Sequence, residues 1–543
     1  MNNLKSIIKL GIVASLVTLA GTSCNSLDLS PIDYYGSGNY WQTPEHVRAY
    51  MDGLHKNVRD KIYQHQYVFG EARGGSSLTG SSVDGVSISY GSLKVQKITP
   101  AAPSVTKWGE LYGLIANINL FIQKTKEATY MSEADKAYYL GQAYGLRAFH
   151  YFDLYRVYGT APLQLEPNKV VNGNFNPEDL YEERASGTKL MTQIKSDLTE
   201  SLQYFGDNKS FDPDNRDNNK GYWSLAATEC LIAEVYLWTA KVTTDDNQAN
   251  EADLAVAKKH LLNLVGNYGL GLEDDFNDVF DVKNKGNKEI IFAVRFAEGE
   301  ASNDQSTVYN LQTGAFRGGN FRDENGNVLD KDTLLVSNGT IQYNEYKKEL
   351  FMKFDKKDSR RDGTFLSVYH KENMKLLGTY VRKNMGYFNT STNRRVWNGD
   401  AIVYRLPLVY LMLAEIENME GGDVAKYINL VRQRAYGKNW NPEVFGYKNA
   451  DFTSNELAIL NEKDKEFVQE GQRWWDVLRM TITKGGKHLV FCKEANIIGE
   501  GEEDLPILDE ATRDFMVLWP IETEMISKDP KVKQTPGDWD KVL

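Results

Sequence analysis

Cysteine and histidine are scarce in this sequence, and their scarcity excludes several kinds of site. The 543 residues include three cysteines and seven scattered histidines, and no Cys-x-x-Cys pair occurs. Zinc sites need such ligands at close spacing, so neither a metal site nor a cofactor is predicted. If Cys24 carries a lipid, Cys230 and Cys492 remain for one disulfide. Cys230 lies in an apolar helical run, which favours a buried free thiol instead.

Clusters of basic residues and long apolar runs are also missing. The formal net charge is −11, and the basic residues are interspersed with acidic ones. Nucleic-acid binding depends on clustered Lys and Arg, so no nucleic-acid partner is predicted. After the N-terminal region, no apolar run approaches the roughly 18 residues of a membrane-spanning helix. No linker rich in proline or serine separates two halves, so we expect one compact body.

Catalytic motifs are absent as well. Neither Gly-x-Ser-x-Gly nor His-Glu-x-x-His occurs in the sequence. Glu415 and Glu417 suggest the paired carboxylates of a glycosidase, but residues two apart on a helix point to different faces. Both are therefore interpreted as structural, and the chain is not expected to be an enzyme.

The N-terminus has the features of a bacterial lipoprotein signal. A basic start with Lys5 and Lys9 precedes an apolar run over residues 10–20; small residues follow, and then comes Cys24. The run is about half the length of a spanning helix, so residues 1–23 are interpreted as a signal peptide and Cys24 as a lipidation site. Gly21 stands where the common signal has leucine, so plain secretion and an uncleaved anchor remain alternatives.

Helical patterns dominate the rest of the chain. Caps and apolar stripes predict helices at residues 45–61, 108–129, 132–158, 180–205, 223–237, 255–265, 405–419, 424–435 and 467–478. Their pairing, with Ala and Gly at the contact points, predicts a mostly α fold of tetratricopeptide-type hairpins. Residues 70–107 are interpreted as a long ordered loop, and residues 270–400 as a loop-rich insertion with short β-strands such as 289–296. We expect an N-terminal helical part over residues 24–269 and a C-terminal part over 270–543.

Seven motifs follow one another in an order that resembles the SusD/RagB family. They are LRAFHYFDLYRVYG at 146–159, NKEIIF at 287–292, DSRR at 358–361, YRLP at 404–407, NLVRQRA at 429–435, EGQRWWD at 470–476 and WPI at 519–521. The resemblance spans essentially the whole mature chain. One departure lies after the fourth motif, where the usual Ala-Glu-Ala is Ala414-Glu415-Ile416.

The resemblance implies both a place and a role. SusD-like proteins are lipid-anchored outer-membrane proteins of Bacteroidota, exposed on the cell surface. They cap a SusC-like TonB-dependent barrel, capture oligosaccharides and deliver them to that transporter without catalysis. Two alternatives stay open: the same architecture binding peptides, and a surface glycosidase with a helical body.

Ligand residues are expected in the loops, because a glycan site needs a flat aromatic ring under the sugar and planar polar groups at its hydroxyls. The early loop offers Arg73, Asp84 and Tyr90, and the middle insertion offers Tyr309, Phe316, Arg317, Tyr387 and Trp397. None of them lies in a family motif.

Two charged groups within the motifs are interpreted as structural. Arg473 and Asp476, three residues apart on one predicted helix, are expected to pair. Asp358, Arg360 and Arg361 are expected to pin a loop through bidentate bonds.

Overall fold

The computed structural model describes residues 40–79, 90–102, 108–167, 178, 181–211, 220–303, 319–330 and 344–542, and within these ranges the chain is mostly helical. The helices of the N-terminal half are α2 (Pro44–Tyr63), a π-helical turn (Gln64–Phe69), α3 (Gly91–Lys94), α4 (Gly109–Glu127), α5 (Glu133–Tyr158), α6 (Gly187–Phe205), α7 (Leu225–Lys241) and α8 (Asp253–Asn267). Those of the C-terminal half are α11 (Lys348–Met352), α12 (Ser359–Thr364), α13 (Leu406–Glu420), α14 (Val424–Tyr436), α15 (Pro442–Phe445), α16 (Phe452–Glu466), α17 (Arg473–Arg479), α18 (Glu510–Arg513) and α19 (Thr523–Lys528).

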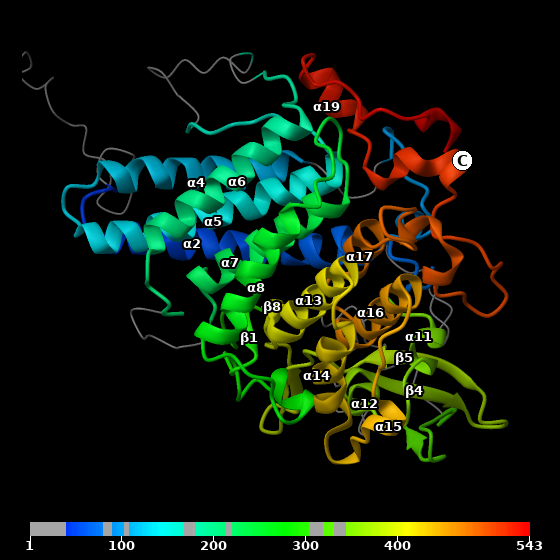
Figure 1. The fold of residues 1–543 in the computed structure, drawn as a ribbon. Helices are drawn as coiled ribbons and strands as arrows, with labels where there is room; N and C mark the ends of the chain where they lie inside the picture. Colours follow the sequence, from blue (N-terminus) through cyan, green and yellow to red (C-terminus); the bar gives the residue numbers. More distant parts are fainter. Residues whose placement is uncertain are drawn as a thin grey trace, which may run out of the picture.

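Helix α5 is the central helix of the N-terminal half, and its ends follow from the sequence. The Ser132 hydroxyl caps it by accepting a hydrogen bond from the Asp135 amide at 3.1 Å. Gly159 ends it with a φ of 73°, a conformation that glycine adopts without strain. Every residue from Tyr139 to Tyr158 is buried, because α4, α6 and α7 all pack against this helix (Figure 1).

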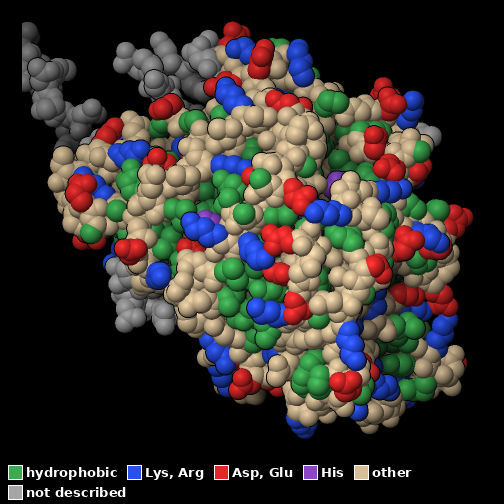
Figure 2. All heavy atoms as spheres, in the orientation of Figure 1, with side chains coloured by type: hydrophobic (Ala, Val, Ile, Leu, Met, Phe, Trp, Pro, Cys, Tyr) green, Lys and Arg blue, Asp and Glu red, His purple; other side chains and the backbone are tan. Residues whose placement is uncertain are grey.

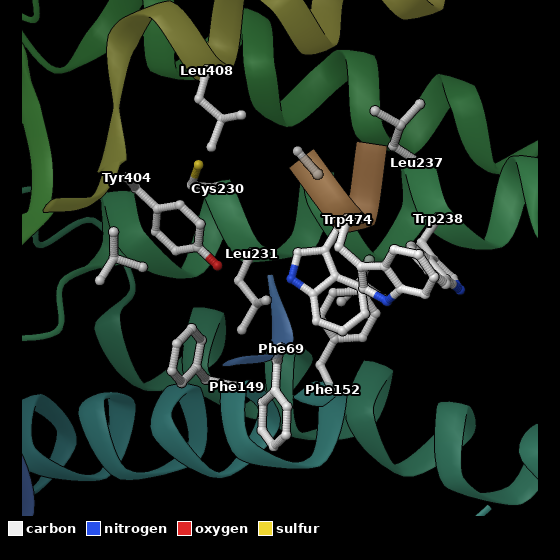
Figure 3. Close-up of a cluster of buried hydrophobic side chains, with 14 of the residues drawn as sticks. Phe69, Phe149, Phe152, Cys230, Leu231, Leu237, Trp238, Tyr404, Leu408 and Trp474 are labelled. Carbon is white, nitrogen blue, oxygen red and sulfur yellow. The ribbon is translucent and has the colours of Figure 1, made fainter. Parts of the chain in front are cut away.

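Neighbouring helices pack as the predicted hairpins, α4 on α5, α6 on α7, α7 on α8 and α13 on α14, and α13 also packs on α8 and α16. One cluster of buried apolar side chains extends from Val47 to Trp539, so both halves share a core. In Figure 3, aromatic rings from distant segments meet in it, among them Phe69, Phe152, Trp238 and Trp474. Cys230 is a buried free thiol in this core, as predicted.

The strands form three small antiparallel units. They are β1 (Ile290–Val294) with β8 (Ala401–Arg405); the sheet β3–β2–β4–β5, made of Val328–Leu329, Phe321–Arg322, Phe365–His370 and Leu376–Val381; and the hairpin of β6 (Tyr387–Asn389) and β7 (Arg394–Val396). Strand β1 was expected at this position. It lies near the start of the 270–400 insertion and pairs with β8 at its end, so one ladder closes the insertion at its base.

Three predicted segments, two helices and one loop, differ from the structure. The helix expected at 180–205 begins only at Gly187. The loop expected at 70–107 contains the short helix α3. The helix expected at 467–478 is wrong: α16 ends at Glu466, and Gln469 and Gly471 take left-handed φ values of 67° and 72° before α17 starts. Among the described residues, no helix combines the length and the apolar character that crossing a membrane requires.

Candidate ligand-binding face

Two adjoining hollows in the described part of the surface share one side chain, Glu300, and together form an extended recessed area. The first hollow, of about 450 Å³, lies between α2 and β1 and includes Asp52, His55, Arg59, Tyr222 and Arg295. The second, of about 710 Å³, lies between the loop after β1 and the β6–β7 hairpin, and includes Glu298, Arg394, Arg395 and Trp397.

The first hollow combines aromatic rings with planar polar groups. Asp52, His55 and Arg59 share one face of α2 because they are spaced by one or two helical turns. The Tyr222 hydroxyl donates to Asp52 Oδ1 at 2.9 Å, and its ring lies edge-on to His55 at a centroid distance of 5.0 Å. His55 Nε2 lies 3.0 Å from Gln142 Oε1. Burial lowers the pKa of His55, so its ring stays neutral at physiological pH.

An ion pair joins the two hollows. Arg59 Nη1 lies 2.6 Å from Glu300 Oε1 and also donates to the Arg295 carbonyl at 3.3 Å. These bonds fix the loop that follows β1 against α2, so the wall between the hollows is set by residues from two distant parts of the chain.

The second hollow has Trp397 in its wall, with 6% of its surface exposed. The Arg395 guanidinium carbon lies 6.0 Å from the Trp397 ring centroid. The Tyr387 hydroxyl donates to Glu298, which raises the pKa of Tyr387. Because Tyr387 pairs with Val396 in the hairpin register, the hairpin positions this hydroxyl beside the lining of the hollow.

The structure brings two of the predicted ligand residues, Tyr387 and Trp397, to the second hollow. Tyr90 lies half-buried elsewhere, with its ring 6.1 Å from Tyr63 and 6.0 Å from Tyr67. None of these three tyrosines lines the first hollow, although Tyr63 lies one turn after Arg59 on α2. Asp84, Tyr309, Phe316, Arg317 and Cys24 lie outside the described residues.

Arg73 lies in the core and does not face solvent. Its side chain is fully buried, donates from Nε to Gln96 Oε1 at 2.7 Å, and lies 4.2 Å from the Trp474 ring. The burial of Arg73 therefore gives it a packing role, and it is not part of the face formed by the two hollows.

Sequence reasoning missed the residues of the first hollow. Their only signal was a run of polar side chains, Asp52, His55 and Arg59, on one face of a predicted helix. Such a run is typical of any solvated helix face. The two partners that turn it into a recess, Tyr222 and Arg295, come from segments about 170 and 240 residues away along the chain.

Of the two predictions about structural charged groups, one is confirmed and the other is wrong. Asp358 binds Arg360 through two bonds of 2.9 and 2.7 Å, as predicted. Arg473 does not pair with Asp476: it binds Asp464, whereas Asp476 binds Lys463 at 2.8 Å and Arg479 at 2.6 Å.

The two glutamates considered for glycosidase chemistry bind different partners. Glu415 is buried against Lys463 and Arg479, and Glu417 pairs with Lys258 on another face of α13. In the described ranges, no group of three His, Cys, Asp or Glu side chains is arranged to hold a metal ion.

The comparisons with known proteins agree with this fold. Sequence models described as "SusD family" and "Starch-binding associating with outer membrane" match residues 313–538 and 40–237. A SusD superfamily protein from Bacteroides fragilis is 51% identical, with a TM-score of 0.86 over 92% of this chain and 100% of that structure. The chain therefore belongs to the SusD/RagB family.

More distant relatives share the same architecture. NanU from B. fragilis is 29% identical, with a TM-score of 0.76 over 94% of this chain and 99% of that structure. SusD-like protein P38 from Formosa agariphila is 23% identical over 94% of this chain and 95% of that protein. A surface glycan-binding protein A from Bacteroides thetaiotaomicron, solved with laminarihexaose, is 18% identical, with a TM-score of 0.66 over 91% of this chain and 100% of that structure, and shares the fold.

Proposed function

We propose that this protein binds oligosaccharides at the cell surface and delivers them to a SusC-like TonB-dependent transporter, without catalysis. The observation that carries the proposal is the pair of joined hollows on a SusD-type fold, which combine aromatic rings with planar polar groups. Sugars offer apolar ring faces and many hydroxyls, and this combination matches both. The starch-binding description of one matching family and the glycans named for structural neighbours support the same class of ligand.

The carboxylates of the two hollows support binding over hydrolysis. Glycosidases need two carboxyl groups free to act on opposite sides of one bond. Here Glu300 is committed to Arg59, Glu298 accepts from Tyr387, and Asp52 accepts from Tyr222. Each carboxylate therefore orients a neighbouring side chain that can contact a sugar.

Lipid anchoring through Cys24 and location in the outer membrane complete the proposal. The signal-like N-terminus supports the anchor, and the matching family description names association with the outer membrane. The acyl chains of a lipoprotein hold firmly where a single chain holds weakly. Cys24→Ser should therefore leave the protein as precursor or in soluble fractions, whereas undiminished membrane retention on fractionation would argue against the anchor.

Affinity electrophoresis against a panel of polysaccharides tests the binding function. Retardation should fall by about tenfold in apparent affinity for Tyr222→Ala, which removes a ring and a hydroxyl from the first hollow. Tyr204→Ala is the control, because this partly buried tyrosine lies on α6 outside both hollows. If no glycan retards the protein and mass spectrometry finds bound peptides instead, the peptide alternative replaces the proposal.

Purification from outer membranes in mild detergent tests the partner. A large TonB-dependent barrel should co-purify in a stable ratio. Recovery of the protein alone under these conditions would count against delivery to such a transporter.

A further inference from the structure

The lining of the two hollows is net positive, although the chain as a whole is net negative. Their lining includes five cationic side chains, from Lys56, Arg59, Arg295, Arg394 and Arg395, and three carboxylates, from Asp52, Glu298 and Glu300. The whole chain has a net charge of −11. On the face shown in Figure 2, acidic and basic side chains are interspersed, with no large area of one sign. The lining of the hollows therefore has the opposite sign of charge to the chain as a whole.

Protein carboxylates neutralise the cations of the first hollow. Lys56 lies 2.5 Å from Asp60, Arg59 lies 2.6 Å from Glu300, and Arg295 lies 3.8 Å from Asp400. These three cations are already paired, so the unbalanced charge lies in the second hollow.

Arg394 and Arg395, on β7, have no such partner. No carboxylate among the described residues forms an ion pair with either guanidinium. Arg395 Nη1 donates to the Met385 carbonyl at 3.3 Å, and its Nε is buried without a hydrogen-bond partner in the described part of the chain. Burial and the nearby charge of Arg382 lower the pKa of Arg395, which reflects a cation held in an unfavourable setting.

A half-buried guanidinium without a carboxylate partner has a desolvation cost that an anion bound at its Nη groups would offset. The fork of Arg N–H groups fits the two oxygens of a carboxylate or sulfate, and Trp397 provides an apolar wall next to it. Arg394 is exposed at the rim, where it attracts an approaching anion without being desolvated.

We propose that the second hollow recognises the acidic group of an anionic glycan, a sugar bearing a carboxylate or a sulfate, through Arg395 with Arg394 at the rim. This inference rests on the proposed glycan-binding function and names its ligand class. Glu298 lines the same hollow and holds the Tyr387 hydroxyl proton, so the remaining lone pairs of both side chains would accept hydrogen bonds from neighbouring sugar hydroxyls.

The test compares charged and neutral polysaccharides on the purified protein. Affinity gels contain polygalacturonate, alginate or hyaluronan as carboxylated polymers, carrageenan or chondroitin sulfate as sulfated ones, and laminarin or carboxyl-reduced polygalacturonate as neutral ones. We expect retardation by at least one anionic polymer, weakened by salt, and little by its neutral counterpart. The carboxylated and sulfated gels distinguish the two acidic groups.

Arg395→Gln should weaken binding of the anionic polymer by about tenfold or more, because a charge-assisted bond is lost. Arg394→Gln, an exposed change that does not threaten folding, should weaken it by about threefold. Arg513→Gln removes a guanidinium from α18, outside both hollows, and should change nothing. Equal melting temperatures would show that the variants remain folded.

The possible failures separate the two proposals. If neutral glycans bind and both arginine variants bind like the parent, the acidic ligand class is overturned and the glycan function stands. If Arg395→Gln lowers the melting temperature and Arg394→Gln leaves affinity unchanged, Arg395 has only a packing role and the inference is also overturned. If no polymer retards the protein, both proposals fall.

Discussion

Glu71 is a carboxyl group that the fold keeps inside the protein. It is 3% exposed and accepts a hydrogen bond from the Gly471 amide at 3.1 Å. Burial raises its pKa from 4.5 to about 8, although a hydrogen bond from Tyr346 and the charge of Arg473 oppose the shift. One side chain next to the segment between α16 and α17 should therefore make stability depend on pH.

The sign of this dependence follows from proton binding. In the unfolded chain Glu71 loses its proton near pH 4.5, and in the folded protein near pH 8, so between these values the native state binds more protons. The Glu71 contribution to the free energy of unfolding should fall as pH rises through this window, by up to about 1.4 kcal/mol per pH unit. Glu71→Gln keeps an acceptor for Gly471 and should flatten the slope, raising stability near pH 8.

Urea unfolding across this pH window measures the slope. Glu494→Gln changes an exposed surface carboxyl group and should leave the slope unchanged. If the free energy of unfolding changes with pH equally in the parent and in Glu71→Gln, then Glu71 has the same pKa in the folded and unfolded states.

At the scale of elements, the break between α16 and α17 depends on a close approach of two chain segments. Gly471 has a φ of 72°, and a Cβ there would lie 2.5 Å from Gln66 Cα. The Trp474 amide also donates to the Gly70 carbonyl at 2.8 Å, which fixes the π-helical segment against the start of α17.

Gly471→Ala should therefore destabilise the protein by several kcal/mol, because both the φ angle and the contact with Gln66 must change. Gly53→Ala is the matched control, because Gly53 lies inside α2 with nothing within 4 Å of the added Cβ. This variant should be more stable by about 0.5–1 kcal/mol. Chemical denaturation of both variants measures the difference, and two changes of the same sign would contradict this account.

Buried ion pairs join α13, α16 and α17. Lys463 on α16 lies 2.5 Å from Glu415 on α13 and 2.8 Å from Asp476 on α17, and all three are almost fully buried. Lys463→Met leaves two buried carboxylates short of one cation and should cost about 3–5 kcal/mol. Lys448→Met breaks an exposed pair with Glu443 and should cost at most about 1 kcal/mol.

Chemical denaturation measures the stability of both lysine variants from the midpoint of unfolding. The slope of the free energy of unfolding against denaturant concentration confirms that each variant exposes the same surface on unfolding. A cost for Lys463→Met as small as that for Lys448→Met would mean that the remaining cations, Arg479 and Lys241, satisfy Glu415 and Asp476 without it.

The sequence predicts elements where local information is enough. The cap at Ser132, the stop at Gly159 and the apolar stripes predict α5 correctly, because each signal lies within a few residues of its effect. The spacing of Phe467, Gly471, Trp474 and Leu478 is also helical, but the backbone there is set by Gln66 and Gly70, about 400 residues away. The site shows the same division: Trp397 and Tyr387 were candidates by residue type, whereas the recess at Tyr222 exists only once α2 and β1 meet.

At the scale of the whole molecule, no cross-link is needed to hold the two halves together. A continuous apolar core extends from α2 to the C-terminal segment, and the β1–β8 ladder closes the insertion onto it. Both cysteines in the described part of the chain are free and buried, and burial raises the pKa of each thiol. Reducing agents should therefore leave the melting temperature unchanged.

The number of reactive thiols tests the proposed anchor on the intact protein. The chain has three cysteines, and a lipid attached to Cys24 would block one of them as a thioether. Protein purified from outer membranes should react slowly with a thiol reagent while folded, because Cys230 and Cys492 are buried. After denaturation it should react with two equivalents of the reagent per chain. Cytoplasmic protein that starts at residue 24 and keeps an unmodified Cys24 should react with three. Three reactive thiols in the membrane-purified protein would rule out a lipid at Cys24.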